Sequence, residues 1–209
     1  MAATRIYTDG ACRGNGAPDA LSGCGVWFGP EDPRNVSTLL PHPPHTNQRA
    51  ELYAAIVAMR AALAQDPPPA VVEIVSDSAY CVKGITTWMH AWEKKGWCKY
   101  DGKPVMNLDL WRAASADARA LRDKGINLYL IWVKGHAGDI GNSAADDLAG
   151  RAVRAAADII AATDAECADT RPTGGPPTDT QSTDVLKPTD AQTTNVEPTD
   201  IQSADMQRP

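Results

Sequence analysis

The sequence predicts an α/β domain built on a mixed β-sheet, with helices on its faces. Three short strand patterns follow one another early in the chain with short connections, which is typical of an antiparallel meander. Strand and helix patterns then alternate, which favours parallel strands joined by helices. One sheet is therefore expected to contain both an antiparallel and a parallel part.

The first strand pattern, Arg5–Asp9, combines β-branched and aromatic residues and ends in a carboxylate. Residues 10–16 contain three glycines and are expected to form a turn that places backbone close to a ligand. An Asp-Gly pair after a strand is most often only a turn. Asp9 therefore becomes a candidate functional residue only if chemically suited groups gather around it.

The meander continues in residues 23–28 and 35–40, two short strand patterns joined by a turn rich in Pro and Asp. Prolines then stop the sheet, and Thr46 can cap a helix in which apolar residues recur at helical spacing as far as Leu63. Glu51 lies about one turn into this helix. It is a second acidic residue that could face the sheet.

Residues 71–76 are a β-branched run of the kind that is buried in a parallel sheet, and they lead into a third acid, Asp77. A helix is expected from Asp77 onward and another over Leu108–Leu121. A last strand over Ile126–Val133 and an alanine-rich helix over Asn142–Ala162 complete the domain. The glycine-containing loop between these last two elements carries a histidine.

Residues 88–97 interleave three tryptophans with basic residues, and four lysines fall within 88–103. A place in the core is the usual explanation for tryptophans. Alternating aromatic and basic side chains also suit a nucleic-acid backbone and its bases. The residues alone leave both explanations open.

Composition divides the chain after residue 162. Residues 163–209 are rich in Thr, Asp, Gln and Pro and lack apolar periodicity, so a disordered acidic tail is expected there. The tail holds nine of the 26 acidic and three of the 20 basic residues, which leaves 17 of each in residues 1–162. The expected folded domain, 1–162, is therefore neutral, and only a local basic patch could hold nucleic acid.

The five cysteines form no C-x-x-C pair, so neither a zinc site nor a disulfide framework is indicated, and a reducing compartment is expected. No apolar run approaches membrane-spanning length, so no membrane partner is expected. The first strand begins too early to leave room for a signal or transit peptide.

Asp9 and Asp77 both follow strands at the carboxyl edge of the expected sheet, where open α/β sheets bind ligands. Glu51 and the adjacent pair Asp146 and Asp147 lie in helices that could face this edge. Carboxylates gathered there would repel one another unless cations neutralise them. Mg²⁺ prefers oxygen ligands, and two such ions about 3.5–4 Å apart can bracket the attacking and leaving oxygens of a phosphodiester. Unrelated surface or capping acids are the alternative.

Five ordered motifs within residues 5–157 resemble type 1 ribonuclease H, above all its eukaryotic form. The resemblance implies the ribonuclease H-like fold: a five-stranded mixed sheet, with an antiparallel meander of three strands plus two parallel strands and helices on both faces. It also implies hydrolysis of the RNA strand of RNA–DNA hybrids by two Mg²⁺ ions, which Mn²⁺ can replace, leaving 5′-phosphate and 3′-hydroxyl ends. The motifs are T-D-G-A-C-R-G-N-G (8–16), T-N-Q-R-A-E-L (46–52), S-D-S (76–78), W-M-H-A-W-E-K-K-G-W (88–97) and G-H-A-G-D-I-G-N-S-A-A-D-D-L-A (135–149).

The resemblance assigns roles to particular residues. The family pattern N-x-x-x-D, followed by a variable residue and L-A, favours Asp146 over Asp147. His136 matches the loop histidine assigned to proton transfer or product release. The implied catalytic carboxylates and metal ligands are Asp9, Glu51, Asp77 and Asp146. The implied substrate-binding residues are Asn15, Asn47 and Gln48 at the minor groove, Trp92 beside the DNA strand, Thr46 and Asn107 at a phosphate pocket, and Lys94 and Lys95 in a basic protrusion.

The chain departs from the family pattern at Glu93, where a lysine of the basic protrusion is common, at Pro44-His45, where the eukaryotic enzyme offers an arginine, and at Ala79. These departures concern affinity for the hybrid. No match to the eukaryotic hybrid-binding module precedes the domain, so processive action is not expected. A monomer is expected, in the cytoplasm or, in a eukaryote, in the nucleus.

Two other functions are weighed against this one. A hybrid-binding or polymerase-tethered domain without activity should have lost a metal carboxylate, and all four are present. An integrase-like or structure-specific nuclease of the same fold should lack the T-N-Q and W-x-x-x-W segments, which this chain contains.

Overall fold

The computed structural model describes residues 3–169, with side chains as far as Glu166. The chain divides into two units, Met1–Arg171 and Pro172–Pro209, and every described residue belongs to the first. Residues 170–209, most of the predicted tail, lie outside the described residues. No helix within the described part is both long and apolar enough to cross a membrane.

A five-stranded sheet runs in the strand order β3-β2-β1-β4-β5. β2 pairs antiparallel with β1 and β3, whereas β4 pairs parallel with β1 and β5. This confirms the predicted mixed sheet, with its meander of three strands and its two parallel strands. The strands are Thr4–Arg13 (β1), Leu21–Trp27 (β2), Val36–Leu39 (β3), Val71–Ser76 (β4) and Asn127–Trp132 (β5).

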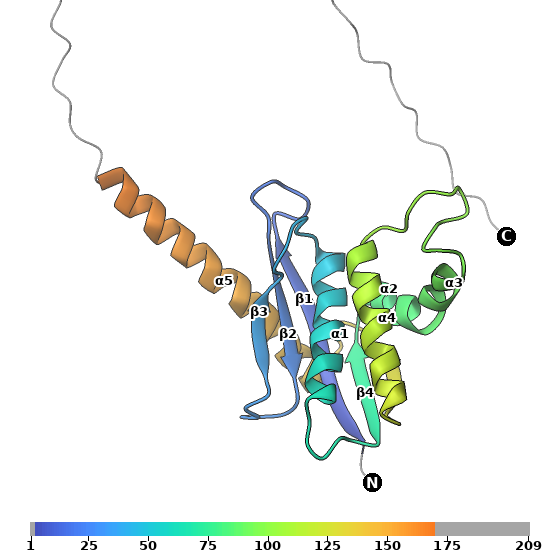
Figure 1. Ribbon diagram of the computed structural model, residues 1–209. Coiled ribbons are helices and arrows are strands. Elements are labelled where there is room, and N and C mark those ends of the chain that lie inside the picture. The colour runs from blue at the N-terminus through green and yellow to red at the C-terminus, as the bar shows by residue number, and fades with distance from the viewer. Residues whose placement is uncertain (1–2, 170–209) are drawn as a thin grey trace, which may run out of the picture. The chain divides into compact units, whose positions relative to one another are not determined.

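Helices cover both faces of the sheet, with α1 and α4 on the near side and α5 behind it in Figure 1. Side chains of a strand alternate between faces. Gly10 of β1 faces α1, whereas Gly23 and Gly25 of β2 face α5. The helices are Asn47–Leu63 (α1), Ala79–Lys83 (α2), Met89–Lys94 (α3), Leu108–Asp123 (α4) and Ile140–Asp169 (α5), with a π-helical turn Gly84–Trp88 (η1) between α2 and α3.

The two faces are packed differently. On the α1 face, large apolar side chains such as Ile6, Ile56 and Trp111 are fully buried and form the main core. On the α5 face, a Cβ at Gly25 would lie 1.9 Å from the carbonyl oxygen of Ala145. Small residues thus let α5 lie directly on the backbone of β2, close to the sheet's carboxyl edge.

Two predicted element ends are wrong. β1 does not end at Asp9, because the following residues pair with β2 as far as Arg13. α5 spans Ile140–Asp169, so the predicted domain boundary after Ala162 falls inside this helix. Residues 163–169 continue it because they contain good helix formers such as Ala and Glu.

Candidate active site

Asp9 lies where two strands separate. β1 pairs with β4 only as far as Tyr7, opposite Val75, whereas its pairing with β2 continues to Arg13. Asp9 is therefore inside β1 yet at the carboxyl edge of the parallel part of the sheet. The register places it opposite Gly25, on the face that α5 covers.

Glu51 is brought to Asp9 by the glycine that follows Asp9. A Cβ at Gly10 would lie 2.2 Å from the backbone nitrogen of Glu51, so only glycine lets α1 lie directly on β1 here. One carboxylate oxygen each from Asp9, Glu51 and Asp77 lies within 4.8 Å of the other two. The structure thus gathers three of the four predicted carboxylates into one cluster.

Asp77 directly follows β4 and is held by residues of β5, of α5 and of the loop between them. Asn142 Nδ2 donates a hydrogen bond to Asp77 Oδ2 at 3.0 Å. Trp132 Nε1 donates to the main-chain oxygen of Asp77 at 2.9 Å. Gly135 passes so close that a Cβ there would lie 2.5 Å from Asp77 Oδ2. Asn142 and Gly135 therefore both confine the same carboxylate oxygen of Asp77, Oδ2, while Trp132 holds its main chain.

Asp146 lies in α5 near Asp9: burial and the charge of Asp77 are the main causes that raise the pKa of Asp9, and the charge of Asp146 adds to them. The next residue, Asp147, is exposed and lines a separate pocket with Trp27 and Arg151. The structure therefore brings Asp146 rather than Asp147 to the cluster. Asp146 stands outside the group of three whose oxygens lie within 4.8 Å of one another.

The cluster is electrostatically unfavourable by itself. Burial, followed by the charge of Asp77, raises the pKa of Asp9 to about 7. Burial, followed by the charges of Asp9 and Asp77, raises the pKa of Glu51 to about 9. Near neutral pH these groups must hold protons or be neutralised by cations.

The donor atoms fit a hard divalent cation. All are carboxylate oxygens, the ligands that Mg²⁺ and Mn²⁺ prefer. Glu51 Oε1 accepts a hydrogen bond from Asn47 Nδ2 at 3.4 Å, but Glu51 Oε2 is buried and has no hydrogen-bond partner among the described residues. A cation would supply the partner that this buried oxygen lacks.

The predicted minor-groove amides gather at the start of α1. Asn15 Oδ1 accepts a hydrogen bond from the backbone nitrogen of Asn47 at 2.9 Å, and Gln48 is exposed beside them. Thr46 caps the helix as predicted, because its Oγ1 accepts from the backbone nitrogen of Arg49 at 3.3 Å. These side chains lie at the end of α1 that carries Glu51, and Asn47 donates a hydrogen bond to Glu51 itself.

Trp92 belongs to an aromatic cluster that packs on the core. Its ring centroid lies 5.8 Å from that of Trp88 and 5.3 Å from that of Trp111. Trp92 is only partly buried, and Lys94 and Lys95 after it are exposed. The tryptophans of this segment therefore contribute to the core, while its lysines face solvent.

Asn107 immediately precedes α4, and its Nδ2 donates to Tyr80 Oη at 3.0 Å.

Glu93 faces a different surface from the one that the sequence suggested. Its carboxylate accepts hydrogen bonds from Ser115 and Arg119 of α4, so it faces α4 and does not interrupt the basic protrusion. The sequence could not show this, because the partners of Glu93 lie on another helix.

His136 is exposed in the loop between β5 and α5 and has a left-handed backbone, with φ 53°. Within the described part of the chain, its imidazole has no hydrogen bond or ion pair. The neighbouring Gly135 contacts Asp77 instead. The structure thus brings the loop to the cluster and leaves the histidine ring in solvent.

Two residues around the site were not among the predicted site residues. Asn142 holds Asp77, and only its place in the N-x-x-x-D pattern could have pointed to it. Arg49 is buried and donates to both carboxylate oxygens of Asp109 on α4, at 2.8 and 2.6 Å. This pair holds the pKa of the Asp109 carboxyl below its usual range. An arginine in a helix pattern gives no sign of such burial.

Fold and site together define an α/β protein with a buried carboxylate cluster, suited to divalent cations, at the edge of a mixed sheet. The family model described as RNase H matches residues 1–154 of the chain. A ribonuclease H of Schizosaccharomyces pombe is 42% identical over 146 residues, which cover 70% of this chain and 51% of the relative. A ribonuclease H of Methylobacillus flagellatus is 40% identical over 151 residues, which cover 71% and 89%. The chain belongs to the ribonuclease H family.

A solved structure supports the same assignment. The crystal structure of LC9-RNase H1, described as a type 1 RNase H with the type 2 active-site motif, is 31% identical and superposes with a TM-score of 0.58. The match covers 73% of this chain and 72% of that one. The chain spans about half the length of the yeast relative but most of the bacterial relative.

Proposed function

We propose that this protein is an endonuclease that hydrolyses the RNA strand of RNA–DNA hybrids and leaves 5′-phosphate and 3′-hydroxyl ends. The observation that carries the proposal is the cluster of Asp9, Glu51 and Asp77, with Asp146 beside it, in a member of the ribonuclease H family. A binding domain without activity would not need to maintain buried, mutually repelling carboxylates.

The four carboxylates would hold two Mg²⁺ ions, or Mn²⁺ in their place. Bound there, the ions would stabilise the charge that develops on the phosphate and make water nucleophilic at neutral pH. Asp9 is the most central ligand, because Glu51, Asp77 and Asp146 all influence its carboxyl group or lie beside it. The chain's contribution is to hold these oxygens together without a competing internal cation.

Other residues would bind the hybrid. Asn15, Asn47 and Gln48 lie next to Glu51 and can donate to and accept from a 2′-hydroxyl, the group that distinguishes RNA from DNA. His136 would move a proton or assist product release from its exposed loop. The DNA strand would contact Trp92, the Thr46 and Asn107 pocket, and the lysines Lys94 and Lys95.

The setting of the protein is also part of the proposal. The four cysteines within the described residues, Cys12, Cys24, Cys81 and Cys98, are free thiols, which suits a reducing intracellular compartment. We place the protein in the cytoplasm, or in the nucleus if its source is eukaryotic, and expect it to act as a monomer.

A cleavage assay tests the proposal. Purified protein is incubated with end-labelled RNA–DNA hybrid, duplex RNA and duplex DNA, in Mg²⁺, in Mn²⁺ and in EDTA. Only the RNA of the hybrid should be cut, and only with a divalent ion. The new 5′ ends should be resistant to labelling by polynucleotide kinase until they are treated with phosphatase. Cleavage of duplex DNA, or hybrid binding without cleavage, would contradict the proposal.

A further inference from the structure

Asn142 is a buried asparagine whose side chain is hydrogen-bonded to a carboxylate of the candidate metal site. It is 4% exposed, its Nδ2 donates to Asp77 Oδ2 at 3.0 Å, and its buried Oδ1 has no hydrogen-bond partner among the described residues. Its position is fixed by the first turn of α5, because its backbone nitrogen donates to Asp139 Oδ1 at 3.0 Å. The Nδ2 group of this amide binds a carboxylate of the candidate metal site, whereas its Oδ1 has no partner among the described residues.

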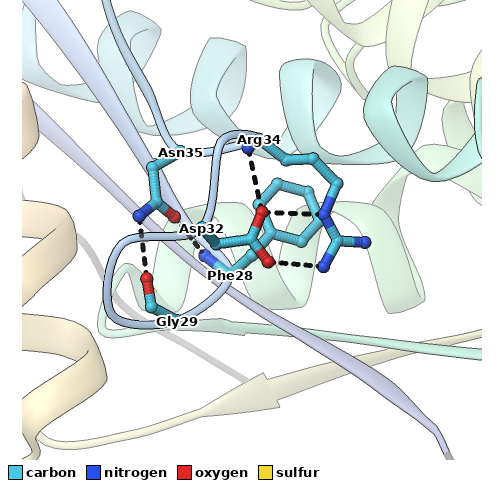
Figure 2. A network of polar contacts seen from close by, with 5 residues as sticks. All are labelled: Phe28, Gly29, Asp32, Arg34 and Asn35. Carbon is cyan, nitrogen blue, oxygen red and sulfur yellow. Dashed lines mark hydrogen bonds and ion pairs between the residues drawn. The ribbon is translucent and has the colours of Figure 1, made fainter.

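The β2–β3 loop contains an asparagine for comparison (Figure 2). Asn35 Oδ1 accepts from the backbone nitrogen of Phe28 at 2.7 Å, and its Nδ2 donates to the carbonyl oxygen of Gly29 at 2.8 Å. Both ends of this amide therefore stabilise the loop. Buried polar atoms in folded proteins usually have partners in this way. In Asn142, by contrast, only the Nδ2 half of the amide is paired among the described residues, and its partner is the carboxylate of Asp77.

We propose that Asn142 is a positioning residue that selects which oxygen of Asp77 is available to a cation. Its amide holds Oδ2 against Gly135, where even a Cβ would come within 2.5 Å of that oxygen. One carboxylate oxygen of Asp77 lies within 4.8 Å of an oxygen of Asp9 and of Glu51, so the orientation that Asn142 gives this carboxylate affects what the cluster presents to a cation. This inference rests on the proposed function for the identity of the cation. It concerns how tightly the site binds that cation, not whether RNA is cut.

The first test measures binding of Mn²⁺ alone by electron paramagnetic resonance, and the Mg²⁺ concentration that gives half of the maximal rise in melting temperature. Asn142→Ala should weaken both about 10–100-fold, the usual effect of removing a group that orients a metal ligand. Asn35→Ala is the matched control. It removes two hydrogen bonds within the β2–β3 loop, neither of them to a residue of the cluster, and should lower the melting temperature while leaving cation binding unchanged.

A second variant reaches Asp77 without changing Asn142. Gly135→Ala should displace the Asp77 carboxylate and weaken cation binding in the same direction, since the backbone of Gly135 is not left-handed but its Cβ would strike Oδ2. Gly29→Ala is its control, because a Cβ at Gly29 would meet no atom within 4 Å. This pair keeps the inference testable even if Asn142→Ala does not fold.

Kinetics separate positioning from a general loss of structure. In Asn142→Ala, the Mg²⁺ concentration for half-maximal cleavage should rise while the KM for hybrid stays within about twofold of the original value. Wild-type cation affinity in both Asn142→Ala and Gly135→Ala would overturn the inference while leaving the proposed function intact. If the wild-type protein binds cations in an Asn142-dependent way but does not cut hybrid, the proposed function fails and the inference stands.

Discussion

Asp32 and Asp9 are the same residue type in two opposite environments. In the β2–β3 loop, Asp32 accepts hydrogen bonds from the backbone nitrogen, Nε and a terminal guanidinium nitrogen of Arg34, at 2.9, 2.9 and 2.6 Å, as Figure 2 shows. These contacts lower the pKa of Asp32 to about 2. Asp9 has acidic neighbours instead, and burial with their charges raises its pKa to about 7.

The difference shows in which region the charges are neutralised by other groups of the chain. The guanidinium of Arg34 also lies over the ring of Phe28, 4.4 Å from its centroid, so the charges of Asp32 and Arg34 are both paired within this loop. Within residues 3–169, no basic side chain forms an ion pair with Asp9, Glu51 or Asp77. A protein keeps such an arrangement where a ligand supplies the missing charge.

The largest effect is expected when Asp9 is replaced by asparagine, and the same replacement at Asp32 is the control. Asp9→Asn keeps the shape but removes a central metal ligand, so cleavage of hybrid should become undetectable while hybrid binding survives. In EDTA at pH 8, the variant should be more stable than the wild-type protein because repulsion falls. Asp32→Asn should keep full activity and lose a little stability. Cleavage assays, gel-shift binding and urea unfolding measure these outcomes, and an active Asp9→Asn protein would remove Asp9 from the mechanism.

The pH dependence of stability should also separate the two regions. A group whose pKa is raised on folding binds more protons in the native state, so its favourable contribution is present at low pH and is lost as pH rises. Without metal, the free energy of unfolding should therefore fall as pH rises from about 4 to about 9. This is the range over which Asp9 and Glu51 lose their protons, and the expected decrease is several kcal/mol in order of magnitude. Asp32 has the opposite sign, because its pKa is lowered on folding: its stabilising contribution is present above about pH 4 and is lost only as pH falls toward 2.

Mg²⁺ provides the control for this pH effect. Saturating Mg²⁺ should flatten the slope above pH 6, since the cation replaces the protons that the cluster would otherwise hold. Urea unfolding at a series of pH values, with Mg²⁺ and with EDTA, gives the measurement. An identical slope under both conditions would mean that the cluster does not bind the ion.

A smaller loss is expected at His136, which lies outside the cluster. His136→Ala should reduce the rate by roughly 10²-fold, the low end of the range for general acid–base assistance, because water can reach this open loop. The requirement for Mg²⁺ should be retained. The shape of the rate-versus-pH curve should change, because the side chain proposed to transfer a proton is removed. Loss of Mg²⁺ binding in this variant would make the histidine part of the metal site.

The smallest effect is expected at Glu93. Glu93→Lys would place a cation beside Arg119 and remove the acceptor for Ser115, so stability should fall by roughly 1 kcal/mol. Hybrid affinity and its salt dependence should stay unchanged, because this side chain faces α4. A steeper salt dependence of binding would indicate a new phosphate contact and would return Glu93 to the hybrid-facing surface.

Much of the architecture could be predicted from the sequence, because secondary structure is encoded in local patterns. The β-branched run of β4 and the Thr46 cap of α1 depend on residues a few positions apart. The motifs then indicated the family, and with it the choice of Asp146 over Asp147. Both lie in α5, and the structure places Asp146 beside Asp9 and Asp147 in a separate pocket.

The remaining features depend on contacts between segments that are far apart in the chain. The sequence alone determined that Asp9 and Asp77 follow strand-forming residues, but only the tertiary structure decided that β1 continues past Asp9, because β2 pairs with it there. It also decided that Asn142 holds Asp77 and that Glu93 turns toward α4. The physical reason is that local sequence sets backbone preference, whereas the partner of a polar side chain depends on which surfaces pack together.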